Sequence, residues 1–168
     1  MEKSTSGDED TYRVFAKDPN SPGDQNLEVP IGDLRVNRQD KSITADDVRN
    51  EDDRNPDRAR LWEVEMSLFV HQSGMKPQDL RSVHADSIEN EATSQAIDRA
   101  REKKGGEESF SISPTEDKEI FDDIMQNTPF GRSTQNILDN TPVGKQVERI
   151  DVSPGLGEDD SNLGFYLA

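Results

Sequence analysis

The sequence predicts a chain that is mostly extended or intrinsically disordered, with two or three short α-helices (about 56–72, 78–103 and 114–126) and no large autonomous core. Two features of composition and one repeat predict this class. Hydrophobic residues make up 29% of the 168 residues, whereas charged residues make up 33% and the formal net charge is −16. Leu, Ile, Val and Phe supply about a fifth of the chain, the level at which disorder begins. Ordering the backbone costs about 1–2 kcal/mol per residue, and we expect too few apolar side chains to offset it.

The repeat lies near the C-terminus. Residues 124–132 (IMQNTPFGR) and 137–145 (ILDNTPVGK) share one pattern: isoleucine, an apolar residue, a polar residue, Asn-Thr-Pro, an apolar residue, Gly and a basic residue. A Pro and a Gly in each copy interrupt regular helix. We therefore expect residues 128–168 to form an extended, repeat-containing tail that lies along a partner.

Residues 1–54 are expected to form a disordered acidic arm with possible short strands. β-Forming residues at 11–16 and alternating apolar residues at 27–31 and 34–36 indicate these strands, and Pro30 interrupts them. We expect such a weak strand pair to be completed against a partner. The almost wholly polar residues 37–59 are interpreted as a linker.

Residues 55–104 are expected to be helical. Asn55-Pro56 is a helix-start signal, and the apolar stripe after it includes Leu61, Trp62 and Phe69. A second helical stretch over 78–103 is predicted by apolar and alanine residues three or four positions apart, namely Leu80, Val83, Ile88, Ala92, Ala96 and Ala100. Gly105-Gly106 is expected to end it.

Residues 105–127 are predicted to contain a short capped helix. The run 113–116 (SPTE) matches a capping box with proline at the first helical position. The helix carries a compact apolar patch that includes Ile120, Phe121 and Ile124. An isolated helix of this length is marginal in water, so we expect the patch to be covered by a partner.

Within the tail, Phe130 and Val143 occupy equivalent positions of the repeat and are predicted to be anchors in pockets of the partner. Arg132 and Lys145 are expected to pair with acidic residues there. The alternative interpretation is that two Thr-Pro turns resemble each other by chance in a low-complexity tail.

Two further features of the sequence have competing interpretations. The apolar end of the chain, 163–168, follows an acidic run and is a second predicted contact, with Phe165 and Tyr166 as anchors; simple fraying is the alternative. Five prolines follow Ser or Thr, which is typical either of proline-directed phosphorylation sites or of turns and helix starts. These positions are Ser21, Ser113, Thr128, Thr141 and Ser153.

The residue types present argue against catalysis, cofactors and metals. Cysteine is absent, which excludes disulfides, thiolate metal sites and thiol catalysis. His71 and His84 lack a local cluster of partners and are interpreted as solvated residues at helix ends. The run 159–164 departs from a calcium-binding loop because Leu163 replaces an oxygen ligand. We therefore expect a non-enzymatic protein with no cofactor and no metal site.

The acidic balance of the chain argues against direct binding of nucleic acid, which requires clustered Lys and Arg. No apolar run approaches the roughly 18 residues of a membrane span. The N-terminal residues lack the basic start and apolar stretch of a secretory signal. We expect the protein in the cytoplasm or nucleus, or inside a virion, without passage through a cleaved signal.

The leading hypothesis is a non-enzymatic structural or assembly protein that wraps along a larger partner or shell, such as a large or repetitive protein assembly, through several linear contacts. A minor virion or scaffold-type component is an example, and linked weak contacts raise overall affinity. A second hypothesis is an acidic regulator or DNA mimic that binds a basic surface. A third is a small helical adaptor, spanning about 55–127, with disordered arms.

Overall fold

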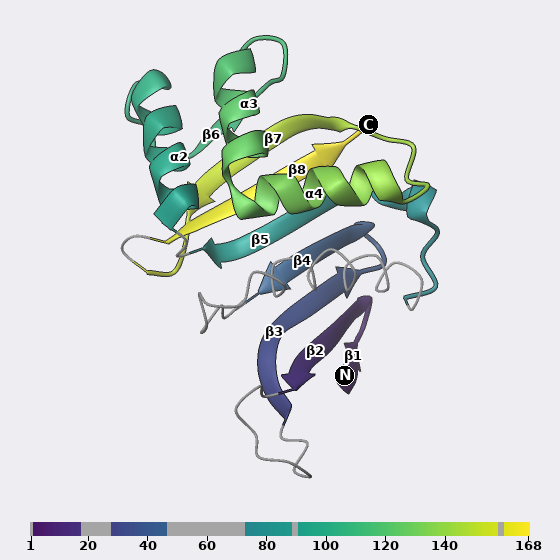
Figure 1. The fold of residues 1–168 in the computed structure, drawn as a ribbon. Coiled ribbons are helices and arrows are strands. Elements are labelled where there is room, and N and C mark those ends of the chain that lie inside the picture. Colours follow the sequence, from purple (N-terminus) through teal and green to yellow (C-terminus); the bar gives the residue numbers. More distant parts are fainter. Residues whose placement is uncertain (1, 18–27, 47–72, 89–90, 158–159) are drawn as a thin grey trace.

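The structure is a computed structural model that describes residues 2–17, 28–46, 73–88, 91–157 and 160–168 (Figure 1). Over these ranges the chain forms an eight-stranded mixed sheet, and three α-helices lie on one face of it. The expectation of a mostly extended or intrinsically disordered chain without a large core is therefore wrong. The helix expected at 56–72 lies outside the described residues.

The elements follow one another along the chain as β1 (Glu2–Ser6), β2 (Glu9–Lys17), β3 (Glu28–Asn37), β4 (Ser42–Asp46), a 3-10 turn (Pro77–Asp79), β5 (Ser82–Ile88), α2 (Glu91–Lys103), β6 (Phe110–Ile112), α3 (Lys118–Asn127), α4 (Pro129–Asn140), β7 (Val147–Pro154) and β8 (Ser161–Leu167). Their order in the sheet is β1-β2-β3-β4-β5-β8-β7-β6. Neighbouring strands are antiparallel except β4 and β5, which are parallel. The helices cover the half of the sheet that contains β5, β8 and β7 (Figure 1).

One face of the sheet is apolar because its strands alternate between apolar and polar residues. A half-buried strand needs an apolar side chain only at every second position, so a chain with 29% hydrophobic residues can still cover one face. The buried strand residues on this face are Tyr12, Leu34, Val36, Ile43, Ala45, Val83, Ala85, Phe110, Ile112, Ile150, Val152, Leu163 and Phe165. The helices contribute Ala96, Ile97, Ala100, Ile120, Ile124, Met125, Ile137 and Leu138 to the same core.

The strand pair expected in the N-terminal region is present, but its partner strands belong to the chain itself. β2 pairs with β3, and the pairing shifts register between Val14 and Phe15. Phe15 lies opposite Pro30, which has no N–H to donate to the ladder. The region is therefore one side of the sheet and not a disordered arm, and residues 42–46, expected to be part of a linker, form β4.

The prediction of a single helix over 78–103 is wrong for the first half of that range. Residues 77–79 form a 3-10 turn, β5 occupies Ser82–Ile88, and only α2 is helical. Val83 fits a helical spacing with Leu80, yet Val83 and Ala85 are buried beside the more exposed His84, which is the period of a strand. The expected helix end is confirmed, since Gly105 and Gly106 both adopt a φ of 82° directly after α2.

A helix is present in the region expected over 114–126, as α3, but it begins four residues later, at Lys118. The expected capping box is not formed, because the N-cap is Asp117 and its side chain makes no capping hydrogen bond. Ser113 has a related role, because its hydroxyl accepts hydrogen bonds from the backbone N–H groups of Thr115 (3.2 Å) and Glu116 (3.3 Å) in the turn before the helix. The apolar patch is covered within the chain. Ile120 and Ile124 are buried and Phe121 packs against the core.

The two copies of the repeat mark two helix ends. α3 ends at Asn127 and α4 ends at Asn140, each the Asn of an Asn-Thr-Pro. Proline has no N–H for the helical ladder, so each copy stops a helix. After the first copy Pro129 opens α4, and after the second the chain turns toward β7. The two copies of the repeat therefore end helices at points where the chain changes direction, whereas an extended tail was expected.

The threonine of each copy makes the same hydrogen bond. Thr128 Oγ1 donates to the carbonyl of Ile124 (2.6 Å), and Thr141 Oγ1 donates to the carbonyl of Ile137 (2.5 Å). Thr128 also accepts from the backbone N–H of Gly131 (3.0 Å), which makes it the N-cap of α4. These bonds satisfy backbone groups that helix ends otherwise leave unpaired.

The end of the chain is a central strand. β8 lies between β5 and β7, and Phe165 is fully buried. The backbones of Gln146 and Ala168 exchange two hydrogen bonds, of 2.9 and 3.0 Å, which extend this ladder to the last residue. Residues 128–157 and 160–168 are therefore folded, and they do not form the extended tail that the repeat suggested.

Candidate functional site

The second face of the sheet is polar, and the three described helices all lie on the opposite face (Figure 1). Alternation places every second side chain of β5, β8 and β7 on this side. We call it the open face and define it by Ser82, His84 and Asp86 of β5, Asn162, Gly164 and Tyr166 of β8, Arg149, Asp151 and Ser153 of β7, and Ser109 and Ser111 at β6.

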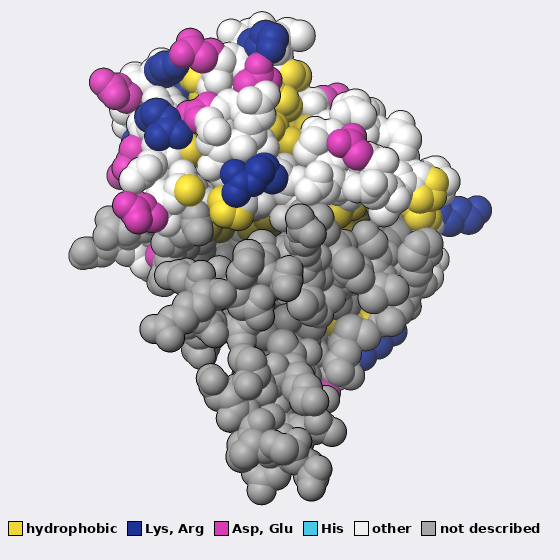
Figure 2. All heavy atoms as spheres, in the orientation of Figure 1, with side chains coloured by type: hydrophobic (Ala, Val, Ile, Leu, Met, Phe, Trp, Pro, Cys, Tyr) yellow, Lys and Arg dark blue, Asp and Glu magenta, His cyan; other side chains and the backbone are white. Residues whose placement is uncertain are grey.

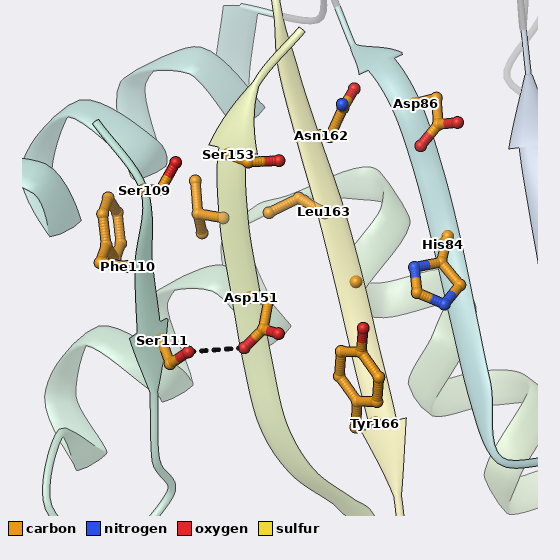
Figure 3. Close-up of a pocket in the computed structure, with 12 residues that line it drawn as sticks. His84, Asp86, Ser109, Phe110, Ser111, Asp151, Ser153, Asn162, Leu163 and Tyr166 are labelled. Atoms are coloured by element: carbon orange, nitrogen blue, oxygen red, sulfur yellow. Dashed lines mark hydrogen bonds between the residues drawn. The ribbon is translucent and has the colours of Figure 1, made fainter. Parts of the chain in front are cut away.

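Strand register aligns four of these residues across the sheet. His84 lies opposite Gly164, Gly164 lies opposite Asp151, and Asp151 lies opposite Ser111. β8 comes last in the sequence but lies between β5 and β7, so residues far apart in the chain become neighbours. Figure 3 shows the side chains of His84, Asp151 and Ser111 on the same side of the sheet.

His84 is held in place by two neighbours. Its Nε2 shares a hydrogen bond with Ser82 Oγ (2.8 Å), and its ring meets the Tyr166 ring edge-on, with centroids 5.5 Å apart. Burial lowers the pKa of His84 below its ordinary value and outweighs Asp86 and Asp151, which act in the opposite direction. The imidazole is therefore neutral at neutral pH, and His84 is not the solvated helix-end residue expected from the sequence.

Asp151 is fixed from both sides. Ser111 Oγ donates to its Oδ1 (2.7 Å), and Arg149 Nε lies 3.0 Å from the same oxygen. Arg149 also lies over the Tyr166 ring, with its guanidinium carbon 4.2 Å from the ring centroid. In Figure 3 the second oxygen of Asp151 points away from Ser111, toward β8. None of the described residues donates a hydrogen bond to this Oδ2.

Asp86 is the second carboxylate of the open face. Its Oδ2 accepts from Arg35 of β3 at 2.8 Å, and no described residue bonds its Oδ1. The side chains of Asp86 and Asp151 are 36% and 38% exposed, so both carboxylates are accessible from solvent.

An open hollow of about 480 Å³ lies between these side chains, and its lining includes His84, Asp86, Ser111, Asp151, Gly164 and Tyr166 (Figure 3). This volume falls within the range of about 300–1,000 Å³ that ligand pockets occupy. Gly164 forms its floor, and any other residue there would meet the His84 ring, because a β-carbon would lie 2.9 Å from Nδ1.

The contacts of His84 do not form a nucleophile–base–acid arrangement. Ser82 is within hydrogen-bonding distance of Nε2, but Nδ1 lies above Gly164, and no described carboxylate hydrogen-bonds it. The Asp86 carboxylate, two residues along the strand, bonds Arg35 instead. Ser82 is also only 5% exposed. The hollow is lined by two carboxylates, hydroxyls and an aromatic ring.

Most of the residues predicted as partner anchors lie inside the fold. Ile120 and Ile124 are buried beneath α3, Phe121 is partly buried, and Val143 is 2% exposed. Leu61, Trp62 and Phe69 lie outside the described residues.

The structure brings two other predicted anchors together. Phe130 of α4 stacks on Phe165 of β8, with ring centroids 5.1 Å apart and planes inclined by 26°. The basic residues of the repeat bind backbone carbonyls of the chain: Arg132 donates to Gln126 (3.2 Å) and Lys145 donates to Leu80 (2.9 Å).

Tyr166 is the one predicted anchor that lines the hollow. Sequence reasoning missed the others, including Asp86, Asp151 and Ser111. The signal that could have found them is the alternation of Ser82, His84 and Asp86, since a period of two separates them from Val83 and Ala85.

No protein family, curated protein or solved structure matches the chain. Over the described ranges, no helix is long and apolar enough to cross a membrane. No group of three or more His, Asp or Glu side chains in the same ranges is arranged to hold a metal ion.

Proposed function

We propose that the chain is a non-enzymatic interaction protein that binds a basic segment of a protein partner through the open face. The observation that carries this proposal is the hollow above Gly164, where two accessible carboxylates, Asp86 and Asp151, each keep one oxygen without a described partner. A basic segment supplies the N–H donors that these oxygens lack, and charge-assisted hydrogen bonds of this kind are the strong ones.

The charge of the whole chain favours the same partner. A formal net charge of −16 attracts a basic protein over long range and raises its association rate, an effect that salt screens. An assembly or scaffold role, or that of an acidic regulator, is compatible with such binding, because both require a protein surface as the ligand.

Figure 2 shows acidic and basic side chains interspersed over the helices. Several of them are paired with each other at short distance: Arg99 with Asp123 (2.8 Å), Lys103 with Glu119 (2.7 Å) and Lys118 with Asp122 (2.5 Å). Exposed pairs of this kind give a basic partner little net attraction. Asp86 and Asp151 of the open face are also paired, with Arg35 and Arg149, so the proposal rests on their second oxygens, which face the hollow.

The experiment is a titration of the isotopically labelled protein with a short peptide rich in Lys and Arg, followed by two-dimensional NMR. The proposal expects the largest amide shifts in β5, β7 and β8, near Gly164. Shifts concentrated on α2, α3 and α4 would show that the peptide binds elsewhere and would reject the open face as the binding surface.

A matched pair of variants separates a specific site from general attraction to an acidic chain. Asp86→Asn with Asp151→Asn removes two charges from the open face, and Asp98→Asn with Asp139→Asn removes two from the helix surface. The first variant is expected to weaken peptide binding far more than the second. Equal weakening by both would mean that only the net charge matters.

A further inference from the structure

We infer that the hollow above Gly164 is a pocket for one cationic side chain, a lysine or an arginine of the partner. This inference rests on the proposed function and adds the chemistry of one subsite to it. Three properties of the hollow support it: its shape, the charge of its lining, and the position of the two arginines that accompany its carboxylates.

The shape of the hollow depends on Gly164. Its neighbours across the sheet, His84 and Asp151, carry side chains on the open face, but Gly164 carries none. Gly164 is itself buried, and a β-carbon there would lie 2.9 Å from His84 Nδ1 and 3.3 Å from Tyr166 Cε2. The His84 and Tyr166 rings meet edge to face, with centroids 5.5 Å apart, and together they form one side of the hollow. A volume of about 480 Å³ is enough for one long side chain to enter beside them.

The lining has one sign of charge. Asp86 and Asp151 are its carboxylates, and His84 is the only basic side chain among the lining residues, with a pKa that burial holds below its ordinary value. A cation in the hollow therefore meets acceptors among the lining residues, while the positive charges of Arg35 and Arg149 pair with the two carboxylates from outside the lining. The hydroxyls of Ser109 and Ser111 at the rim are further acceptors.

The two arginines leave the hollow open. Arg35 reaches Asp86 from β3, on the far side of β5 and β4, and Arg149 lies over the Tyr166 ring. Each arginine occupies one oxygen of its carboxylate. The Oδ2 of Asp151 points toward β8, where the floor residue Gly164 lies directly opposite it (Figure 3). Asp151 is therefore the residue expected to contact the incoming cation, with Asp86 adding longer-range attraction.

The test uses three capped tripeptides with glycine on both sides of a central arginine, lysine or citrulline. Citrulline has the shape of arginine without its charge. The arginine and lysine peptides are expected to shift the amides of Gly164 and Ser111 in NMR titrations of the full chain, and the citrulline peptide is expected to bind at least about tenfold more weakly, the factor that loss of a charge-assisted hydrogen bond brings. Asp151→Asn should reduce arginine binding by a similar factor, whereas Asp98→Asn should leave it unchanged.

Equal shifts with citrulline and arginine would overturn the inference, and this comparison needs no variant to fold. A larger Gly164 shift with methyl glucoside than with the arginine peptide would assign the hollow to neutral polyols instead. The two proposals fail differently. If the longer basic peptide binds the open face while the tripeptides do not reach Gly164, only the cation pocket is rejected. If neither binds the open face, the proposed function is rejected as well.

Discussion

Gly164 of β8 lies directly opposite His84 of β5, and a β-carbon at Gly164 would stand 2.9 Å from His84 Nδ1. The same pair forms the floor and one wall of the hollow on the open face. The shape of this site therefore depends on the absence of a single side chain in the central strand of the sheet.

Gly164→Ala is expected to push the His84 ring out of position and to weaken its hydrogen bond to Ser82. Overpacking of this kind lowers the free energy of unfolding by about 1–3 kcal/mol. The ring would also become more exposed, so the pKa of His84 should rise toward its ordinary value. Urea unfolding and an NMR titration of the imidazole measure the two effects.

A double-mutant cycle provides the control for this prediction. In a His84→Ala background the side chain that the new methyl group meets is gone, so Gly164→Ala should cost less there. Equal costs in the two backgrounds would show that the clash with His84 is not what disfavours alanine.

The lowered pKa of His84 predicts how stability depends on pH. Above the ordinary His value of 6.5, His84 is neutral in both the folded and unfolded chain and contributes no pH dependence. As the pH falls from 6.5 through the lower folded pKa, the unfolded chain takes up the proton first, so the free energy of unfolding decreases. Urea unfolding across this range should show a decline that His84→Gln removes. A decline of the same size in His84→Gln would assign it to other groups.

Local signals in the sequence predicted some of these elements but did not predict the sheet. The signals for α3 and for the end of α2 are local, since a serine turn, a proline or a glycine pair acts on the backbone beside it. The strand at 82–88 was missed because Leu80, Val83 and Ile88 also fit a helical spacing, and local periodicity alone does not decide between the two. Average composition failed because amphipathic strands such as β7 use few apolar residues to bury one face.

The site was harder to predict from the sequence than the fold. His84 and Asp151 are brought within two strands of each other only because β8, the last strand in the chain, inserts between β5 and β7. No local pattern specifies that insertion. For the repeat, the sequence prediction failed in the opposite way. Its regular pattern suggested contacts with a partner, but in the structure it specifies two helix ends within the chain.

The two threonines of the repeat provide a matched pair for testing that structural role. Thr128 is fully buried and its hydroxyl makes two hydrogen bonds, whereas Thr141 is partly exposed and its hydroxyl makes one. Thr128→Val is expected to lower the free energy of unfolding by about 1–2 kcal/mol through loss of the cap and of a buried bond. Thr141→Val should cost less because water can replace its bond. Chemical denaturation measures both, and equal losses would contradict the assigned roles.

Because Phe130 stacks on Phe165 within the fold, its loss should destabilise the isolated chain, whereas loss of a partner anchor should not. Phe130→Ala removes a ring that is partly buried against the core, and it should lower the free energy of unfolding by about 2–3 kcal/mol. Arg132→Ala, two residues away and exposed, should change it by no more than about 0.5 kcal/mol. Unchanged thermal and chemical unfolding of Phe130→Ala would show that the ring does not stabilise the isolated chain.

The central claim, that the open face is the binding surface for a basic protein segment, is tested most directly by calorimetric titration of a Lys- and Arg-rich peptide into three proteins of known charge. Wild type is expected to bind it, Asp98→Asn with Asp139→Asn to bind it nearly as well, and Asp86→Asn with Asp151→Asn to bind it at least about tenfold more weakly. Equal affinities of the two double variants would contradict the account, since the carboxylates of the hollow would then be no different from acids elsewhere on the surface.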